Sequence, residues 1–172
     1  VLTTPNNPTG LAMSIEEIEP IVAASPGIVV VDEAYIEFTR EVSGLTLLEH
    51  YPNAISLRTF SKAYGLAGLR LGYLIGHPEV MQEMMKARLP FQIDRFAGHV
   101  ALALLDRPAL IARRIAEMQT NTAALTDALA TIGGIEVVPS QTNFVLFKTP
   151  HPADTMLQRL ADAGVLIRNM GG

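Results

Sequence analysis

The chain has 172 residues, of which 49% are hydrophobic and 17% charged, with a net charge of −4 and no cysteine. This composition is typical of a packed globular protein and argues against disorder. It provides no basic face for nucleic acid or an anionic membrane, and it excludes disulfides, thiolate metal sites and a cysteine nucleophile. We therefore expect small-molecule partners and a cytoplasmic protein, with which the absence of cysteine is compatible.

Neither a membrane span nor a targeting segment is expected. The longest apolar stretch, at residues 97–105, is too short to cross a bilayer, and the chain does not open with a charged and then apolar leader. The first residue is Val1 rather than methionine, and it falls inside what reads as the end of a strand. We expect the chain to be a piece of a longer protein.

The first hundred residues are expected to alternate strands with helices. Ser14 and Glu17 form a capping box that predicts a helix start, and Ser-Pro-Gly at residues 25–27 ends that helix. Pro78 fits the first position of a second helix. Apolar runs predict three strands, the first of them buried on both faces, at residues 27–35, 54–60 and 69–76.

The rest of the chain begins with a long amphipathic helix. Apolar residues spaced by three and four predict a helix from about Pro108 to Ile132, ended by two glycines. Further elements are expected as two short strands, a helix and a last strand, near residue 136 and at residues 144–147, 152–163 and 165–168. Strands alternating with helices indicate an α/β fold. The change of pattern near residues 100–110 predicts two domains, residues 1–105 and 106–172.

Several polar residues lie at or near the expected ends of strands. Asn7 lies in PNNPTG, where two prolines stiffen the turn and fix a side-chain amide, although a plain turn is the simpler interpretation. Asp32 ends a strand, where open α/β sheets place ligand groups, but taken alone a helix cap or a loop acid is the simpler interpretation. Taken alone, Tyr35 fits a core position and Lys62 a solvated surface position.

Arg70 carries the strongest single signal. We expect it inside the strand at residues 69–76, where an unpaired charge would be very costly, so it requires an anion or a carboxylate. The four histidines show no metal-ligand spacing, and we assign no metal to them. Dinucleotide-binding and P-loop glycine motifs do not occur in the sequence.

The joint pattern is far more specific than any of its members. An acid at a strand end, a lysine flanked by Thr59 and Ser61, and an arginine eight residues after that lysine resemble the fold type I pyridoxal-phosphate aminotransferases. Within them, the chain is most similar to the histidinol-phosphate aminotransferases in four segments: TPNNPTG, VVVDEAYIEF, RTFSKAYGLAGLRLGY and SQTNFVLF. The resemblance covers essentially the whole chain, in the order of that family. It implies the latter part of the large domain, a mostly parallel sheet with helices, followed by an α+β small domain.

The resemblance also implies roles for individual residues. Lys62 would be the catalytic residue that holds pyridoxal 5'-phosphate as an imine and afterwards moves a proton. Asp32 would pair with the ring nitrogen of the cofactor. Tyr35 and Asn7 would hydrogen-bond its phenolic oxygen. Its phosphate would be held by three residues, Thr59, Ser61 and Arg70.

The implied substrates are a small-molecule amino donor and a 2-oxo acid. Arg168 resembles the substrate-binding arginine of the family, and Asn143 lies near that site in the family, although a turn-capping role is an equal alternative. We expect transamination between L-histidinol phosphate and 2-oxoglutarate by a homodimer. The alternatives are an aminotransferase for aromatic amino acids, a phosphothreonine decarboxylase, and a non-catalytic fragment that self-associates. Because the chain resembles only the later half of the family, we expect it to be inactive alone.

Overall fold

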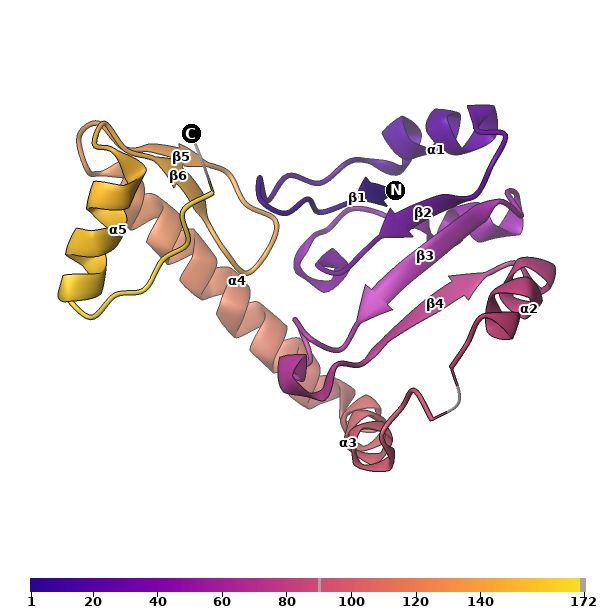
Figure 1. Ribbon diagram of the computed structural model, residues 1–172. Helices are drawn as coiled ribbons and strands as arrows, with labels where there is room; N and C mark the ends of the chain where they lie inside the picture. Colours follow the sequence, from indigo (N-terminus) through magenta and orange to yellow (C-terminus); the bar gives the residue numbers. More distant parts are fainter. Residues whose placement is uncertain (90, 171–172) are drawn as a thin grey trace.

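The computed structural model describes residues 1–89 and 91–170 and contains two sheets. Figure 1 shows the larger sheet with helix α1 (Ile15–Ala24) beside its first strands, and a long helix, α4 (Pro108–Ala130), running from this part to the smaller sheet. The α/β class expected from the sequence is confirmed. None of the helices among the described residues is both long enough and apolar enough to cross a membrane.

The larger sheet is mixed and mostly parallel. Its strand order is β1-β2-β3-β4, in which the first three strands are parallel and the last is antiparallel to β3. The bounds of these strands are Leu2–Thr3 for β1, Val29–Asp32 for β2, Ala54–Thr59 for β3 and Gly72–Gly76 for β4. The three strands predicted from apolar runs are therefore present, although β2 and β4 are shorter than expected.

The core of this sheet lies against one face of β2. Ile18 and Val22 of α1 pack on Val29 and Val31, together with Leu47 from the 3-10 helix η2 (Gly44–Glu49). The capping box predicted at Ser14 and Glu17 is present and fixes the start of α1. The expectation that β2 is buried on both faces is wrong, because residues 30 and 32, on the other face, remain partly exposed.

Arg70 does not lie inside a strand, which corrects the sequence prediction. It follows the 3-10 helix η3 (Ala67–Leu69), has a left-handed φ of 52°, and its side chain is exposed. The pairing of β4 with β3 begins at Gly72, which lies opposite Thr59. The residues before Leu71 therefore have no neighbouring strand to join. The Arg70 guanidinium donates a hydrogen bond to the Ala67 carbonyl at 2.9 Å. Burial therefore does not force this arginine to take an anion.

Three helices follow the larger sheet. The helix expected from Pro78 is present as α2 (Pro78–Lys86), and the long helix is present as α4. Between them lies α3 (Arg95–Leu105), which the sequence analysis missed. Its start has a clear local signal, because the Asp94 carboxylate accepts a hydrogen bond from the Ala97 amide at 3.1 Å.

The smaller sheet pairs β5 (Glu136–Val138) with β6 (Leu146–Lys148) in antiparallel fashion. The predicted helix follows as α5 (Ala153–Asp162), and Gly164 beyond it has the positive φ of 82° that favours glycine after a helix. The strand expected at residues 165–168 is wrong, since that segment pairs with neither β5 nor β6 in the described chain.

Candidate active site

Four of the residues singled out by the sequence analysis, Asn7, Asp32, Tyr35 and Lys62, lie at or just after the ends of strands at one edge of the larger sheet. Because β1, β2 and β3 are parallel, their carboxyl ends meet at the same edge, which is where open α/β sheets bind ligands (Figure 1). Asn7 follows β1, Tyr35 follows β2 and Lys62 follows β3. Strand order thus brings together three motifs that are far apart in the sequence.

Tyr35 is the centre of this group. The Asn7 side-chain amide donates a hydrogen bond to the Tyr35 hydroxyl at 3.0 Å. The Lys62 ammonium lies 4.9 Å from the centroid of the Tyr35 ring, in the geometry of a cation–π contact. Phe144 packs edge-on against the same ring, with 5.4 Å between centroids. The structure therefore places Asn7, Tyr35 and Lys62 in one group.

Asp32 keeps one carboxylate oxygen available. Its Oδ1 accepts a hydrogen bond from the Ala34 amide at 3.1 Å, which orients the side chain. Over residues 1–89 and 91–170, Oδ2 accepts no hydrogen bond and the side chain makes no ion pair. A partly buried carboxylate held in this way can still accept a proton-bearing nitrogen.

The proposed phosphate-binding residues are only partly assembled. The Thr59 and Ser61 hydroxyl oxygens lie 2.9 Å apart, and the Ser61 amide donates to the Thr59 hydroxyl at 3.0 Å. These two hydroxyls thus form a compact pair at the end of β3. Arg70 bonds to the Ala67 carbonyl rather than to either hydroxyl.

Asn143 and Arg168 are not bonded to the Lys62 group in the part of the chain that the structure describes. Asn143 is exposed and lines a hollow of about 310 Å³ with residues of α4, and it is adjacent to Phe144. Arg168 is exposed beyond α5. Within the described part of the chain, no hydrogen bond or ion pair joins either residue to Asn7, Tyr35 or Lys62.

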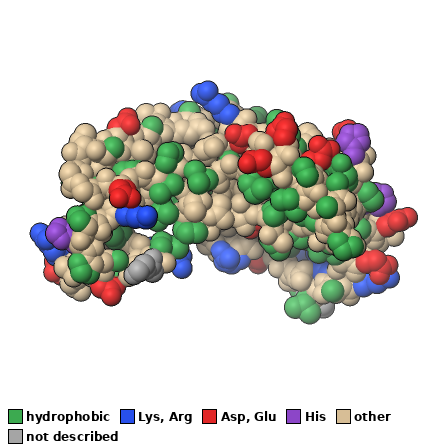
Figure 2. Space-filling model, turned by 90° about the horizontal axis from the view of Figure 1, so that it is seen from above, with side chains coloured by type: hydrophobic (Ala, Val, Ile, Leu, Met, Phe, Trp, Pro, Cys, Tyr) green, Lys and Arg blue, Asp and Glu red, His purple; other side chains and the backbone are tan. Residues whose placement is uncertain are grey.

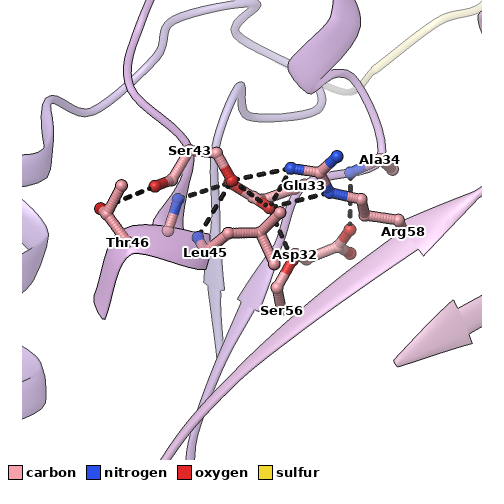
Figure 3. A network of polar contacts seen from close by, with 9 residues as sticks. Asp32, Glu33, Ala34, Ser43, Leu45, Thr46, Ser56 and Arg58 are labelled. Carbon is pink, nitrogen blue, oxygen red and sulfur yellow. Dashed lines mark hydrogen bonds and ion pairs between the residues drawn. The ribbon is translucent and has the colours of Figure 1, made fainter. Parts of the chain in front are cut away.

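A buried charge network behind the site was missed by the sequence analysis (Figure 3). Glu33 is 0% exposed and accepts hydrogen bonds from the Ser43 hydroxyl at 2.8 Å, the Gly44 amide at 2.7 Å and the Ser56 hydroxyl at 2.6 Å. Arg58 completes the set, with its Nη2 3.1 Å from Glu33 Oε2. One carboxylate therefore joins β2, β3 and the start of η2.

The signal for this network was present in the sequence. Arg58 lies within the apolar run of β3, where a charge needs a partner. The charge partner that was expected for Arg70 is instead found at Arg58. The sequence does not reveal the register between β2 and β3. In that register the Glu33 amide donates a hydrogen bond to the Leu57 carbonyl at 2.9 Å, which brings Glu33 beside Arg58.

The charges around Arg58 influence one another. Burial disfavours the Arg58 charge, but the Glu33 carboxylate and Tyr73 outweigh this effect and raise the pKa of Arg58. Burial raises the pKa of Glu37, and a backbone hydrogen bond and the Arg58 charge offset this rise only in part. Glu37 Oε2 is buried and has no hydrogen-bond partner in the described residues. Burial, Tyr73 and Glu37 also raise the pKa of Tyr64.

Known proteins are similar to this chain in both sequence and fold. A sequence profile of the family Aminotransferase class I and II matches residues 1–171. A histidinol-phosphate aminotransferase of Thermobifida fusca is 46% identical in an alignment of 172 residues that covers 99% of this chain and 47% of the relative.

Two solved structures superpose closely on the chain. Histidinol-phosphate aminotransferase from Sinorhizobium meliloti, in complex with pyridoxal-5'-phosphate, has a TM-score of 0.91 at 32% identity, covering 99% of this chain and 48% of that one. L-threonine-O-3-phosphate decarboxylase from Porphyromonas gingivalis has a TM-score of 0.86 at 31% identity, covering 98% and 53%.

The family is established by these similarities. The chain belongs to the aminotransferase class I and II family. It spans about half the length of the curated relatives that it matches.

We predict that the Glu33–Arg58 pair contributes strongly to stability. Glu33→Gln leaves the largely buried Arg58 without a countercharge, and we expect the free energy of unfolding to fall by about 3 kcal/mol in urea titrations of the full-length protein. The matched control is Glu83→Gln, which breaks the exposed pair with Lys86 and should change little. Equal effects of the two substitutions would contradict this role for Glu33.

Glu37 should make stability fall as the pH rises. An unfolded glutamate loses its proton near its ordinary pKa of 4.5, whereas burial keeps Glu37 protonated to higher pH in the native state. Above pH 4.5 Glu37 therefore keeps its proton longer in the native state than in the unfolded state, so its contribution to stability declines toward neutrality. Glu37→Gln should flatten this decline in denaturant titrations at several pH values. Glu117→Gln, at an exposed position on α4, should retain it, and a decline unchanged in Glu37→Gln would exclude Glu37 as its source.

Proposed function

We propose that this chain forms part of a pyridoxal-phosphate-dependent aminotransferase that exchanges an amino group between L-histidinol phosphate and 2-oxoglutarate. The observation that carries the proposal is the grouping of Asn7, Tyr35 and Lys62 at the carboxyl edge of the sheet. Asp32, at the end of β2, adds a carboxylate with a free oxygen. The named activity of the Thermobifida fusca relative supports the choice of substrate.

The residues present fit the cofactor. Bound pyridoxal phosphate supplies a ring that accepts the electron pair released at the substrate Cα. Lys62 would hold it covalently and then carry a proton, and the free Asp32 oxygen would face its ring nitrogen. The donor pair of Asn7 and Tyr35 suits a phenolic oxygen.

The cofactor phosphate would bind the neighbouring hydroxyls of Thr59 and Ser61. Arg70 would join them by exchanging its contact with the Ala67 carbonyl for the anion, which is the stronger, charge-assisted partner.

We assign recognition of the substrate to Arg168, with a second contribution from Asn143. Arg168 is exposed, so its planar guanidinium can bind the carboxylate or phosphate of a small molecule at little desolvation cost. Asn143 is exposed beside Phe144, which itself contacts Tyr35. We therefore assign Arg168, which follows α5, to the same site as Tyr35, with the segment before β6 lying between them in the proposed substrate-binding region.

A decarboxylase acting on phosphothreonine is a second candidate. It is favoured by the similarity to the Porphyromonas gingivalis enzyme, at 31% identity and a TM-score of 0.86. Both candidates use a phosphorylated amine and the same cofactor chemistry, so the reaction and not the cofactor separates them. A non-catalytic role for the chain alone is consistent with its covering about half of its relatives.

We further propose a cytoplasmic homodimer with two domains in this chain. The division at residues 105 and 106 coincides with the break between α3 and α4.

Figure 2 shows hydrophobic side chains reaching the surface over much of one face, and Phe91, Phe96 and Leu102 around α3 are also exposed. Apolar side chains of this kind favour burial against a second copy. The absence of cysteine accommodates a reducing compartment.

Lys62 should carry the cofactor in the full-length protein. Borohydride reduction followed by peptide mass mapping is expected to find the pyridoxyl group on Lys62 and on no other lysine. Assays with histidinol phosphate and with phosphothreonine then separate transamination from decarboxylation. Label on a different lysine would refute the assignment, and absence of label would refute the cofactor itself.

Arg168→Lys should weaken substrate binding. A point charge cannot reproduce the two parallel hydrogen bonds of a guanidinium, so KM for histidinol phosphate or for 2-oxoglutarate should rise about tenfold while the pyridoxyl label on Lys62 is unchanged. Arg159→Lys, at an exposed position on α5, is the matched control and should behave as wild type. Unchanged kinetics for both substrates would remove Arg168 from the site.

A further inference from the structure

We propose that Arg114 of α4 is a positioning residue for the turn that carries Lys62. The proposal rests on the function proposed above, since it concerns the same lysine. Gly65, three residues after Lys62, has a φ of +70°, and its amide donates to the Lys62 carbonyl at 3.0 Å. A Cβ atom on Gly65 would lie 2.7 Å from Arg114 Nη2 and 3.4 Å from its Cζ. The guanidinium therefore lies directly on the α-carbon of the turn.

No charge partner accounts for the place of Arg114. Its side chain is only partly exposed, and among the described residues it makes no ion pair and no hydrogen bond. The adjacent Arg113 is exposed to solvent. The planar guanidinium is suited to packing on a flat backbone surface, which here only a glycine provides. Contact with the Lys62 turn is thus the feature that distinguishes Arg114 from Arg113.

The same stretch of α4 also holds the turn that carries Tyr35. Ile115 and Met118 pack on the cluster formed by Tyr35, Phe38 and Ala63. The Gln119 amide donates a hydrogen bond to the Phe38 carbonyl at 2.9 Å. Because Ala63 follows Lys62 directly, this stretch of the helix contacts the turns after both β2 and β3.

Helix α4 continues from these contacts to β5 and β6. The chain that leaves β5 leads through Asn143 to β6, and Arg168 follows α5. The Arg114–Gly65 contact therefore connects the Lys62 turn to the part of the chain proposed to bind substrate. Catalysis is sensitive to displacements well below 1 Å, so loss of this contact should impair the use of Lys62 more than the binding of substrate.

The test compares Arg114→Ala with Arg113→Ala in the full-length protein loaded with pyridoxal phosphate. Arg114→Ala should lower kcat about tenfold with KM unchanged. It should also shift the pH at which the visible absorbance of the Lys62-bound cofactor changes, which a role in folding alone would not do. Arg113→Ala removes the same charge one residue away and should alter neither. Equal behaviour of the two variants would overturn the proposal.

Two further variants separate the loss of the Arg114 contact from a loss of folding. Arg114→Met keeps the aliphatic stem while removing the guanidinium, and should reproduce the absorbance shift at a wild-type melting temperature. Gly65→Ala should destabilise, and part of that loss should be relieved in the double variant Gly65→Ala/Arg114→Ala, because the clash at 2.7 Å is gone. Strict additivity of the two losses would refute the contact. Wild-type protein that takes no cofactor at Lys62 would refute the proposed function instead.

Discussion

The ion pair between Glu33 and Arg58 is the constraint on which the rest of the site depends. A carboxylate that is fully buried is tolerated only when its charge and its lone pairs are satisfied, and Glu33 receives donors from β3 and from the start of η2. Those donors hold the ends of β2 and β3 together at the edge where ligands bind. Asp32 precedes Glu33 in the chain, so the network fixes the backbone from which the proposed cofactor-binding carboxylate projects.

Side chains alternate along a strand, which explains the different roles of two adjacent acids. Glu33 lies on the same side as Val29 and Val31, toward the core, and takes the buried arginine. Asp32 points the other way, and its Oδ2 accepts no hydrogen bond from the residues that the structure describes. A single shift of register would exchange the two and leave Arg58 without a partner. The pairing of β2 with β3 is thus as important to the site as any residue in it.

Long-range contacts near this edge connect an early and a late segment of the chain. The Gln141 amide donates to the Gly10 carbonyl at 2.7 Å, and a Cβ on Gly10 would lie 2.6 Å from the Ser140 hydroxyl. The loop that holds Asn7 therefore fits closely against the segment before β6. Together with the packing of Phe144 on Tyr35, this brings together motifs that the sequence separates by more than a hundred residues.

The sequence by itself determined the features that depend on neighbours in the chain. The capping box at Ser14 and the proline starts of α2 and α4 are local, and each was predicted correctly. Only the tertiary structure decided the rest, because it depends on which strands pair. Arg70 lies outside the strand expected for it because the pairing of β4 with β3 does not extend to it. Arg58 pairs with Glu33, which is 25 residues away in the sequence. The bond from Asn7 to Tyr35 spans 28 residues and likewise exists because parallel strands end at one edge.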